Sequence, residues 1–121
     1  DKYGHLIGDE VLVNICQVCS NEIREIDFLG RYGGEEFVII LPDCDIGGGL
    51  ETARRIQASL ATQSVSVKNE EIQMTLSIGL AAFNEKHTCF EELINDADRA
   101  MYLAKENGRN RIEVYQSQNL H

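Results

Sequence analysis

The residue types best suited to chemistry stand together in one short stretch, Gly33-Gly34-Glu35-Glu36-Phe37. Two adjacent glycines let the backbone form a tight corner and let a ligand come close to it. Two neighbouring carboxylates repel each other, and one way to hold both ionised is to bind a divalent cation. Mg²⁺ in proteins takes one or two carboxylates together with substrate phosphates. The stretch therefore predicts a metal-assisted phosphate site, although Glu35-Glu36 without the glycines would more often be a solvated acidic turn.

The cysteines form a second candidate, because Cys16-Gln-Val-Cys19 is formally a C-x-x-C motif. Such a motif is typical of a redox pair or of half a zinc site. No second C-x-x-C and no closely spaced histidine pair follows, whereas a structural zinc site needs four ligands. Both cysteines also fall on the apolar phase of a helical pattern, where cysteine behaves as a small hydrophobic residue. We therefore predict that both belong to the core.

The composition indicates one ordinary globular domain. The chain has 121 residues, 43% hydrophobic and 26% charged, which excludes a disordered tail, a collagen-like repeat and a low-complexity linker. Its 11 basic and 20 acidic residues give a formal net charge of −9. That charge repels polyanions, so we expect no nucleic-acid partner and no direct membrane contact. No apolar run approaches the ~18 residues of a membrane span, and we expect a cytoplasmic domain, whether or not its parent protein is membrane-anchored.

Hydrophobic periodicity predicts the elements that must position these groups. Helices are expected over three ranges: 9–25, 46–61 and 89–106. Strands are expected over four ranges: 28–32, 37–41, 74–82 and 111–115. Asp45 is the expected N-cap of the second helix, and Asn107-Gly108 the stop signal of the third. The first two strands should form a hairpin with the glycines at its corner, and residues 37–41 should be buried on both faces of a sheet.

Together with further motifs, the signature resembles the GGDEF domain, the family of diguanylate cyclases that make cyclic di-GMP from GTP. Arg31-Tyr32 precedes the signature, as is usual in the family, and Glu35 in place of Asp is an accepted active variant. The other matching motifs follow in chain order: Tyr3-Gly4-His5 with Gly8-Asp9, Thr75-Leu76-Ser77-Ile78-Gly79, Asp96-Ala97-Asp98 with Ala100-Met101-Tyr102, and Lys105-Glu106-Asn107-Gly108-Arg109-Asn110.

The resemblance covers essentially the whole chain and implies a single GGDEF domain over residues 1–121. The implied fold class is α/β, an α+β sandwich of the ferredoxin-like βαββαβ type found in nucleotide cyclases. The family's first helix and its central first strand would precede Asp1. They would carry an aspartate metal ligand, a phosphate-binding segment and an asparagine that reads guanine. We therefore expect these 121 residues alone to be inactive, although the parent protein should be active.

The resemblance also implies roles for the substrate-binding and catalytic residues. Glu35 would bind the divalent metal, Mg²⁺ or Mn²⁺, and Glu36 would lie beside it as a second acidic group. Gly33 and Gly34 would pass close to the nucleotide. Asp9 would accept hydrogen bonds from the guanine edge, because an ionised carboxylate only accepts.

Lys105 and Arg109 would contact the terminal phosphates, one turn apart around the stop of the third helix. Without the other motifs, cations that compensate a helix C-terminus would explain this pair equally well.

A separate inhibitory product site is implied by the spacing of Arg24 and Asp27, which match the family's RxxD motif. Arginine can fork onto O6 and N7 of guanine, and aspartate can accept from its N–H groups. Arg55 occupies the position of a further inhibitory arginine in some members. The alternative for Arg24 and Asp27 is a surface ion pair worth about 0–1 kcal/mol.

The implied reaction is nucleotidyl transfer, in which two GTP molecules form cyclic di-GMP and pyrophosphate leaves. Each domain would hold one GTP, so catalysis would need a homodimer, usually controlled by an upstream sensory domain. The alternative is a non-catalytic GGDEF module that binds cyclic di-GMP or GTP for regulation, against which the intact signature argues. A ferredoxin-like RNA-binding domain is disfavoured by the net charge of −9 and by the lack of an aromatic RNA-binding strand.

Overall fold

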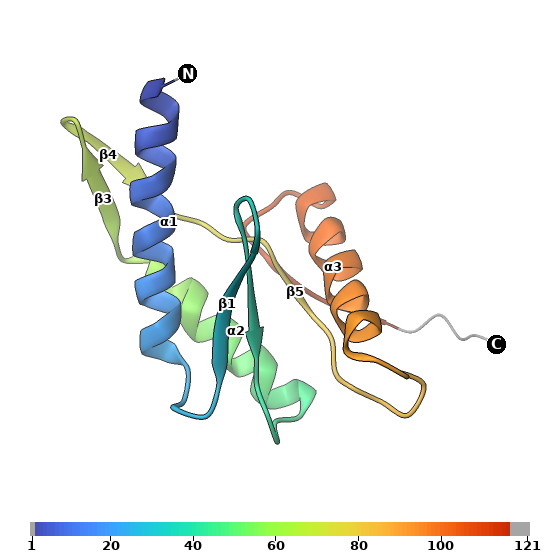
Figure 1. The fold of residues 1–121 in the computed structure, drawn as a ribbon. Coiled ribbons are helices and arrows are strands. Elements are labelled where there is room, and N and C mark those ends of the chain that lie inside the picture. The colour runs from blue at the N-terminus through green and yellow to red at the C-terminus, as the bar shows by residue number, and fades with distance from the viewer. Residues whose placement is uncertain (1, 117–121) are drawn as a thin grey trace. The chain divides into compact units, whose positions relative to one another are not determined.

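The computed structural model describes residues 2–116 of the chain. The elements are α1 (Lys2–Glu22), β1 (Phe28–Gly33), β2 (Glu36–Ile40), α2 (Ile46–Ala61), β3 (Ser64–Val67), β4 (Glu70–Gln73), β5 (Ile78–Leu80), α3 (Phe90–Glu106) and β6 (Ile112–Val114) (Figure 1). They fall into two compact units. The first unit comprises Asp1–Cys44 and Arg54–Thr75, and the second comprises Asp45–Ala53 and Leu76–His121.

The first unit contains α1 and two antiparallel hairpins. β1 pairs with β2, and the register shifts between Arg31 and Gly33, directly before the turn. β3 pairs with β4, and β3 contacts α1 (Figure 1). The buried hydrophobic side chains of α1 recur at helical spacing: Ile15, Val18 and Cys19. Burial of this apolar stripe stabilises a helix more than its intrinsic propensity does.

The second unit is built on a β-α-β crossover. β5 and β6 pair in parallel, and α3, which joins them, contacts both strands. Ala100 and Ala104 of α3 are fully buried. A Cβ on Gly79 in β5 would lie 2.1 Å from the carbonyl oxygen of Ala97 and 2.2 Å from the amide nitrogen of Met101. Glycine is therefore required at position 79, because the strand and the helix touch there.

The structure confirms three helices, the signature hairpin and both helix signals, although the first helix spans Lys2–Glu22 rather than the expected 9–25. The Gly48 N–H donates to Oδ1 of Asp45 at 2.8 Å, so Asp45 caps α2. Gly108 has φ of 122°, and the Arg109 N–H donates back to the carbonyl oxygen of Ala104 at 2.8 Å. This bond closes the C-terminus of α3, as the Asn107-Gly108 pair predicts.

Some expectations about the elements were wrong. Every residue of β2 is partly exposed rather than buried on both faces, because β1 is its only hydrogen-bonded neighbour in the described part of the chain. The strand expected over 74–82 is limited to Ile78–Leu80. The β3–β4 hairpin was not predicted. Cys19 is a core residue at 3% exposure, but Cys16 is only partly buried.

Candidate functional site

The signature lies at the turn between β1 and β2. Gly33 ends β1 and pairs with Glu36, the first residue of β2, so Gly34 and Glu35 form the turn itself. Glu35 is exposed and Glu36 is partly buried. Two residues that are adjacent in sequence therefore bring carboxylates to this turn, and that of Glu35 belongs to an exposed residue that a cation and its water ligands can reach.

The two signature glycines are not required by the fold of this unit. A Cβ at Gly33 or Gly34 would meet no heavy atom within 4 Å, and neither residue has the left-handed φ that favours glycine. Gly79 is the opposite case, because its Cβ would overlap α3. Glycine at 33 and 34 leaves the backbone bare toward open space. Such a surface suits a ligand that approaches the main chain closely.

Arg31 holds the turn from the β1 side. Its Nε donates to the carbonyl oxygen of Gly34 at 3.0 Å, and its Nη2 donates to the same oxygen. A guanidinium is planar and always charged, so a two-pronged contact of this kind fixes both position and orientation. Sequence reasoning treated Arg31 only as part of the motif and missed this contact.

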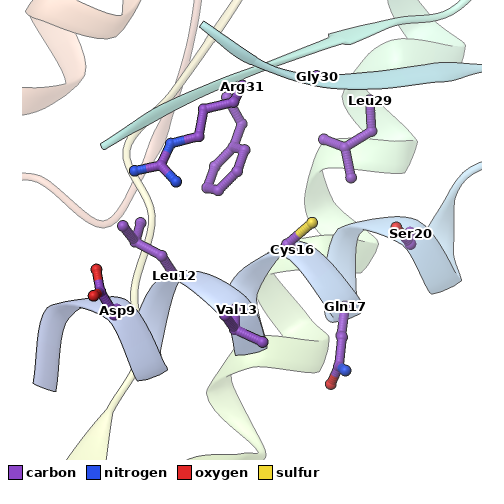
Figure 2. A pocket seen from close by; sticks show the side chains of 10 residues that line it. Asp9, Leu12, Val13, Cys16, Gln17, Ser20, Leu29, Gly30 and Arg31 are labelled. Carbon is purple, nitrogen blue, oxygen red and sulfur yellow. The ribbon is translucent and has the colours of Figure 1, made fainter. Parts of the chain in front are cut away.

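A pocket of about 780 Å³ lies beside the turn, within the first unit. Its lining residues come from α1, β1 and β2: Asp9, Leu12, Val13, Cys16, Gln17, Ser20, Leu29, Gly30, Arg31 and Phe37. Figure 2 shows the Arg31 side chain extending from its strand on the side of Asp9 and Leu12. The volume falls within the range of small-molecule sites, which combine mostly apolar walls with a few polar groups. Asp9, expected to read guanine, therefore lines a pocket large enough for a base.

Arg24 and Asp27 form a tight pair at the end of the α1–β1 connection. Arg24 Nη2 donates to Asp27 Oδ1 at 2.7 Å, and Arg24 Nε donates to both carboxylate oxygens at 3.1 Å. The Arg24 backbone N–H adds a bond to Oδ2 at 2.6 Å. The Asp27 carboxylate is only 2% exposed, whereas the Arg24 side chain is 48% exposed. The hydrogen bond from Arg24 holds the pKa of Asp27 below its usual range and raises that of Arg24.

Arg55 belongs to α2, and its side chain contacts Glu22, the last residue of α1. Its Nη2 donates to the carbonyl oxygen of Glu22 at 3.0 Å, and its Nε donates to Oε1 of the same residue at 3.3 Å. The last carbonyls of a helix lack partners within the helix, so Arg55 satisfies one of them. Arg24 lies two residues after Glu22 and donates to the carbonyl oxygen of Pro42 at 2.7 Å. The three residues expected at the inhibitory site thus lie in one unit and involve the same connection.

Lys105 and Arg109 belong to the second unit. Lys105 is in the last turn of α3, and Arg109 lies past the helix end with φ of 62°. Arg109 is exposed and Lys105 partly buried. The two cations therefore flank the helix stop as expected, but only Lys105 is helical.

The chemistry of the donor set can be tested against the expected metal. Among the side chains that the structure describes, those of residues 8–116, no cluster of three or more His, Cys, Asp or Glu is arranged to hold a metal ion. Glu35 and Glu36 offer hard carboxylate oxygens, the ligands that Mg²⁺ prefers, and Mg²⁺ commonly completes its shell with phosphate and water. The two residues thus fit a cation that is bound jointly with a phosphorylated ligand.

The described part of the chain contains no helix both long and apolar enough to cross a membrane.

Comparison with known proteins assigns the class of the domain. Residues 1–111 match the family described as "Diguanylate cyclase, GGDEF domain". The chain is 41% identical over 118 residues to diguanylate cyclase DosC of Escherichia coli, covering 97% of this chain and 25% of DosC. It therefore spans about a quarter of the length of that relative.

Solved structures agree with the sequence match. The GGDEF domain of YfiN (TpbB) from Pseudomonas aeruginosa superposes with a TM-score of 0.89 at 32% identity, covering 98% of this chain and 74% of that one. The GGDEF domain of DgcB from Caulobacter crescentus, solved in complex with c-di-GMP, gives 0.88 at 29% identity, with 97% and 70% covered. The mixed α/β fold is that of these domains. The chain belongs to the GGDEF family.

Proposed function

We propose that this chain is the catalytic domain of a diguanylate cyclase, a single domain over residues 1–121 that joins two GTP molecules into cyclic di-GMP. The signature turn carries the proposal. It presents two adjacent carboxylates beside two glycines that the fold itself does not need. Membership of a family whose curated relative DosC is a diguanylate cyclase supports the same activity.

In this mechanism the residues of the first unit bind and orient one nucleotide. Glu35 holds the divalent cation, with Glu36 as a second acidic group next to it. The bare backbone of Gly33 and Gly34 lets the phosphates approach the turn. Asp9, which lines the pocket, accepts from the N–H groups of guanine. The bound cation supplies charge neutralisation at the phosphates and helps to orient the attack.

Each bond-forming step is a displacement at phosphorus. The 3′-oxygen of one GTP forms a bond to the α-phosphorus of the other, the bond from that phosphorus to the pyrophosphate oxygen breaks, and the hydroxyl proton passes to solvent water. A second, identical step closes the ring. Lys105 and Arg109 contact the terminal phosphates, which leave as pyrophosphate. Because the chain has one signature turn, two chains in two-fold symmetry supply the two substrates, with an upstream sensory domain controlling their pairing.

Product inhibition is the finer part of the proposal. Arg24 is half-exposed and can meet a guanine of cyclic di-GMP, whereas both oxygens of Asp27 are bonded to Arg24. In this arrangement Asp27 orients Arg24 rather than touching the ligand. Arg55 joins the site from α2, since it bonds to Glu22 at the start of the same connection.

The decisive experiment is Glu35→Gln in the full-length protein, with Glu51→Gln on α2 as the matched control. We expect Glu35→Gln to lower cyclic di-GMP formation at least ~100-fold, because a carboxylate that holds the cation is lost, while the control retains activity. Chromatography of the nucleotide products measures this. Near-normal synthesis by Glu35→Gln would refute the assigned role of Glu35.

The same proteins test the non-catalytic alternative. Calorimetric titration with cyclic di-GMP should show binding by wild type and Glu35→Gln, and loss of binding by Arg24→Ala. Binding by a wild-type protein that forms no cyclic di-GMP with Mg²⁺ or Mn²⁺ would favour a regulatory module over a cyclase.

A further inference from the structure

Arg31 makes a contact that the mechanism above leaves unused. Its guanidinium reaches over the signature turn and donates twice, through Nε and Nη2, to one backbone oxygen, that of Gly34. The register shifts between Arg31 and Gly33, so the strand pairing is irregular directly before the Gly33–Glu36 pair that closes the turn. The Arg31 side chain therefore adds a second restraint on the backbone of the turn.

The bonded oxygen is directly connected to the geometry of Glu35. The Gly34 carbonyl and the Glu35 amide belong to one planar peptide group. Fixing that oxygen therefore fixes the plane from which the Cα of Glu35 continues and restricts the direction of its side chain. The need is greatest here, because glycine populates more backbone conformations than any other residue. A Gly-Gly turn without such a contact would let Glu35 sample many directions.

We infer that Arg31 is a positioning residue, which orients Glu35 for cation binding by clamping the Gly34 carbonyl. The inference rests on the proposed function of the signature turn. It assigns Arg31 an action through the backbone, so its removal should first weaken the bound cation. The competing role is direct contact with the nucleotide, because Arg31 also lines the pocket beside the turn.

The test compares three variants of the full-length protein: Arg31→Ala, Arg31→Lys and the control Arg54→Ala. Arg54 is an exposed arginine on α2, in the same unit. Mn²⁺ is titrated in the presence of the non-hydrolysable analogue α,β-methylene GTP, and the electron paramagnetic resonance signal of free Mn²⁺ is followed. We expect about 10-fold weaker Mn²⁺ binding for Arg31→Ala, the size typical of losing a group that orients a metal ligand.

Arg31→Lys should fall between Arg31→Ala and wild type, because an ammonium can donate to the Gly34 oxygen but cannot fork onto it. Arg54→Ala should bind like wild type. In cyclisation assays, the Mn²⁺ concentration for half-maximal rate should rise about 10-fold for Arg31→Ala, with kcat recovering at saturating Mn²⁺. Melting curves check folding, and Arg31→Lys decides the matter if Arg31→Ala does not fold.

Unchanged Mn²⁺ affinity in both Arg31 variants would overturn the inference, as would a loss of kcat that saturating Mn²⁺ does not restore. The second result would indicate direct contact between Arg31 and the nucleotide. Failure of the proposed function looks different, since wild type itself would then form no cyclic di-GMP. The Mn²⁺ titration would still compare Arg31 variants with wild type in that case.

Discussion

At the scale of single residues, glycine has two different functions in this chain, and the space around each position separates them. Gly79 lies against the backbone of α3, whereas Gly33 and Gly34 face open space. The first is a packing requirement of β5. The second pair is available to a ligand.

Substitution by alanine should therefore change the free energy of unfolding far more at Gly79 than at Gly34. Gly79→Ala should lower the free energy of unfolding by at least about 1–3 kcal/mol, because the added methyl would overlap backbone atoms of α3. Gly34→Ala should change it by no more than about 1 kcal/mol, since alanine fits the existing backbone. Urea unfolding of both variants measures the difference. Equal losses at both positions would contradict this explanation of the glycines.

The Arg24–Asp27 pair makes a prediction about pH. The hydrogen bond from Arg24 lowers the pKa of Asp27, so the pair stabilises the folded state at neutral pH. That contribution is fully present above the usual aspartate pKa near 4 and is lost as the pH falls through the lower folded value. Carboxyl ¹³C NMR should show Asp27 titrating below the usual aspartate range. In Arg24→Ala its pKa should move up toward the usual range, and an unchanged value would argue against the pair.

At the scale of elements, α2 depends on its first residues. Three glycines occupy positions 47–49, and each weakens a helix by up to ~1 kcal/mol relative to alanine. The cap from Asp45 to the Gly48 N–H counteracts this. Asp45→Ala should thus lower the free energy of unfolding by about 1 kcal/mol. Hydrogen exchange at the Gly48 amide should accelerate at the same time, whereas Glu51→Ala on the same helix should leave that amide unchanged.

Many of the helices and strands could be predicted from the sequence because local signals specify them. Amphipathic stripes specify the three helices, Asp45 marks the start of α2, Asn107-Gly108 marks the end of α3, and Gly-Gly specifies the corner of the signature hairpin. The β3–β4 hairpin also carries a signal, which was overlooked. The buried residues Val65 and Val67 alternate with the exposed Ser64 and Ser66, and the Lys68-Asn69 turn has positive φ at both residues. Such two-residue turns are typical of hairpins.

The candidate site was predictable only in part. The carboxylates and glycines of the signature are adjacent in sequence, so their joint position at one turn follows directly from the hairpin. The clamp by Arg31 lies next to a register shift between Arg31 and Gly33, and the sequence pattern predicts neither feature. The burial of the Asp27 carboxylate was equally hidden, because an RxxD spacing gives no information on exposure.

At the scale of the whole molecule, the strands described here pair only two by two. The three sheets are β1–β2, β3–β4 and β5–β6. The β3–β4 sheet contacts α1 and the β5–β6 sheet contacts α3, whereas the β1–β2 sheet, which carries the signature turn, has only two strands in the described part of the chain. A two-stranded sheet is marginally stable by itself. The 121 residues alone should therefore form no detectable cyclic di-GMP under conditions where the full-length protein is active. Chromatographic detection of product from the isolated chain would contradict this.

The cysteine on the pocket wall gives the protein a built-in chemical reporter. Cys16 lines the pocket, whereas burial raises the pKa of the neighbouring Cys19 to about 11 and keeps that thiol protonated and unreactive at neutral pH. A maleimide should therefore alkylate Cys16 and spare Cys19, as peptide mass spectrometry can read out. A nucleotide seated beside Asp9 should slow alkylation at Cys16 but not at the exposed Cys89. The rate of Cys16 alkylation would then report whether a nucleotide occupies the pocket, without any measurement of enzymatic turnover.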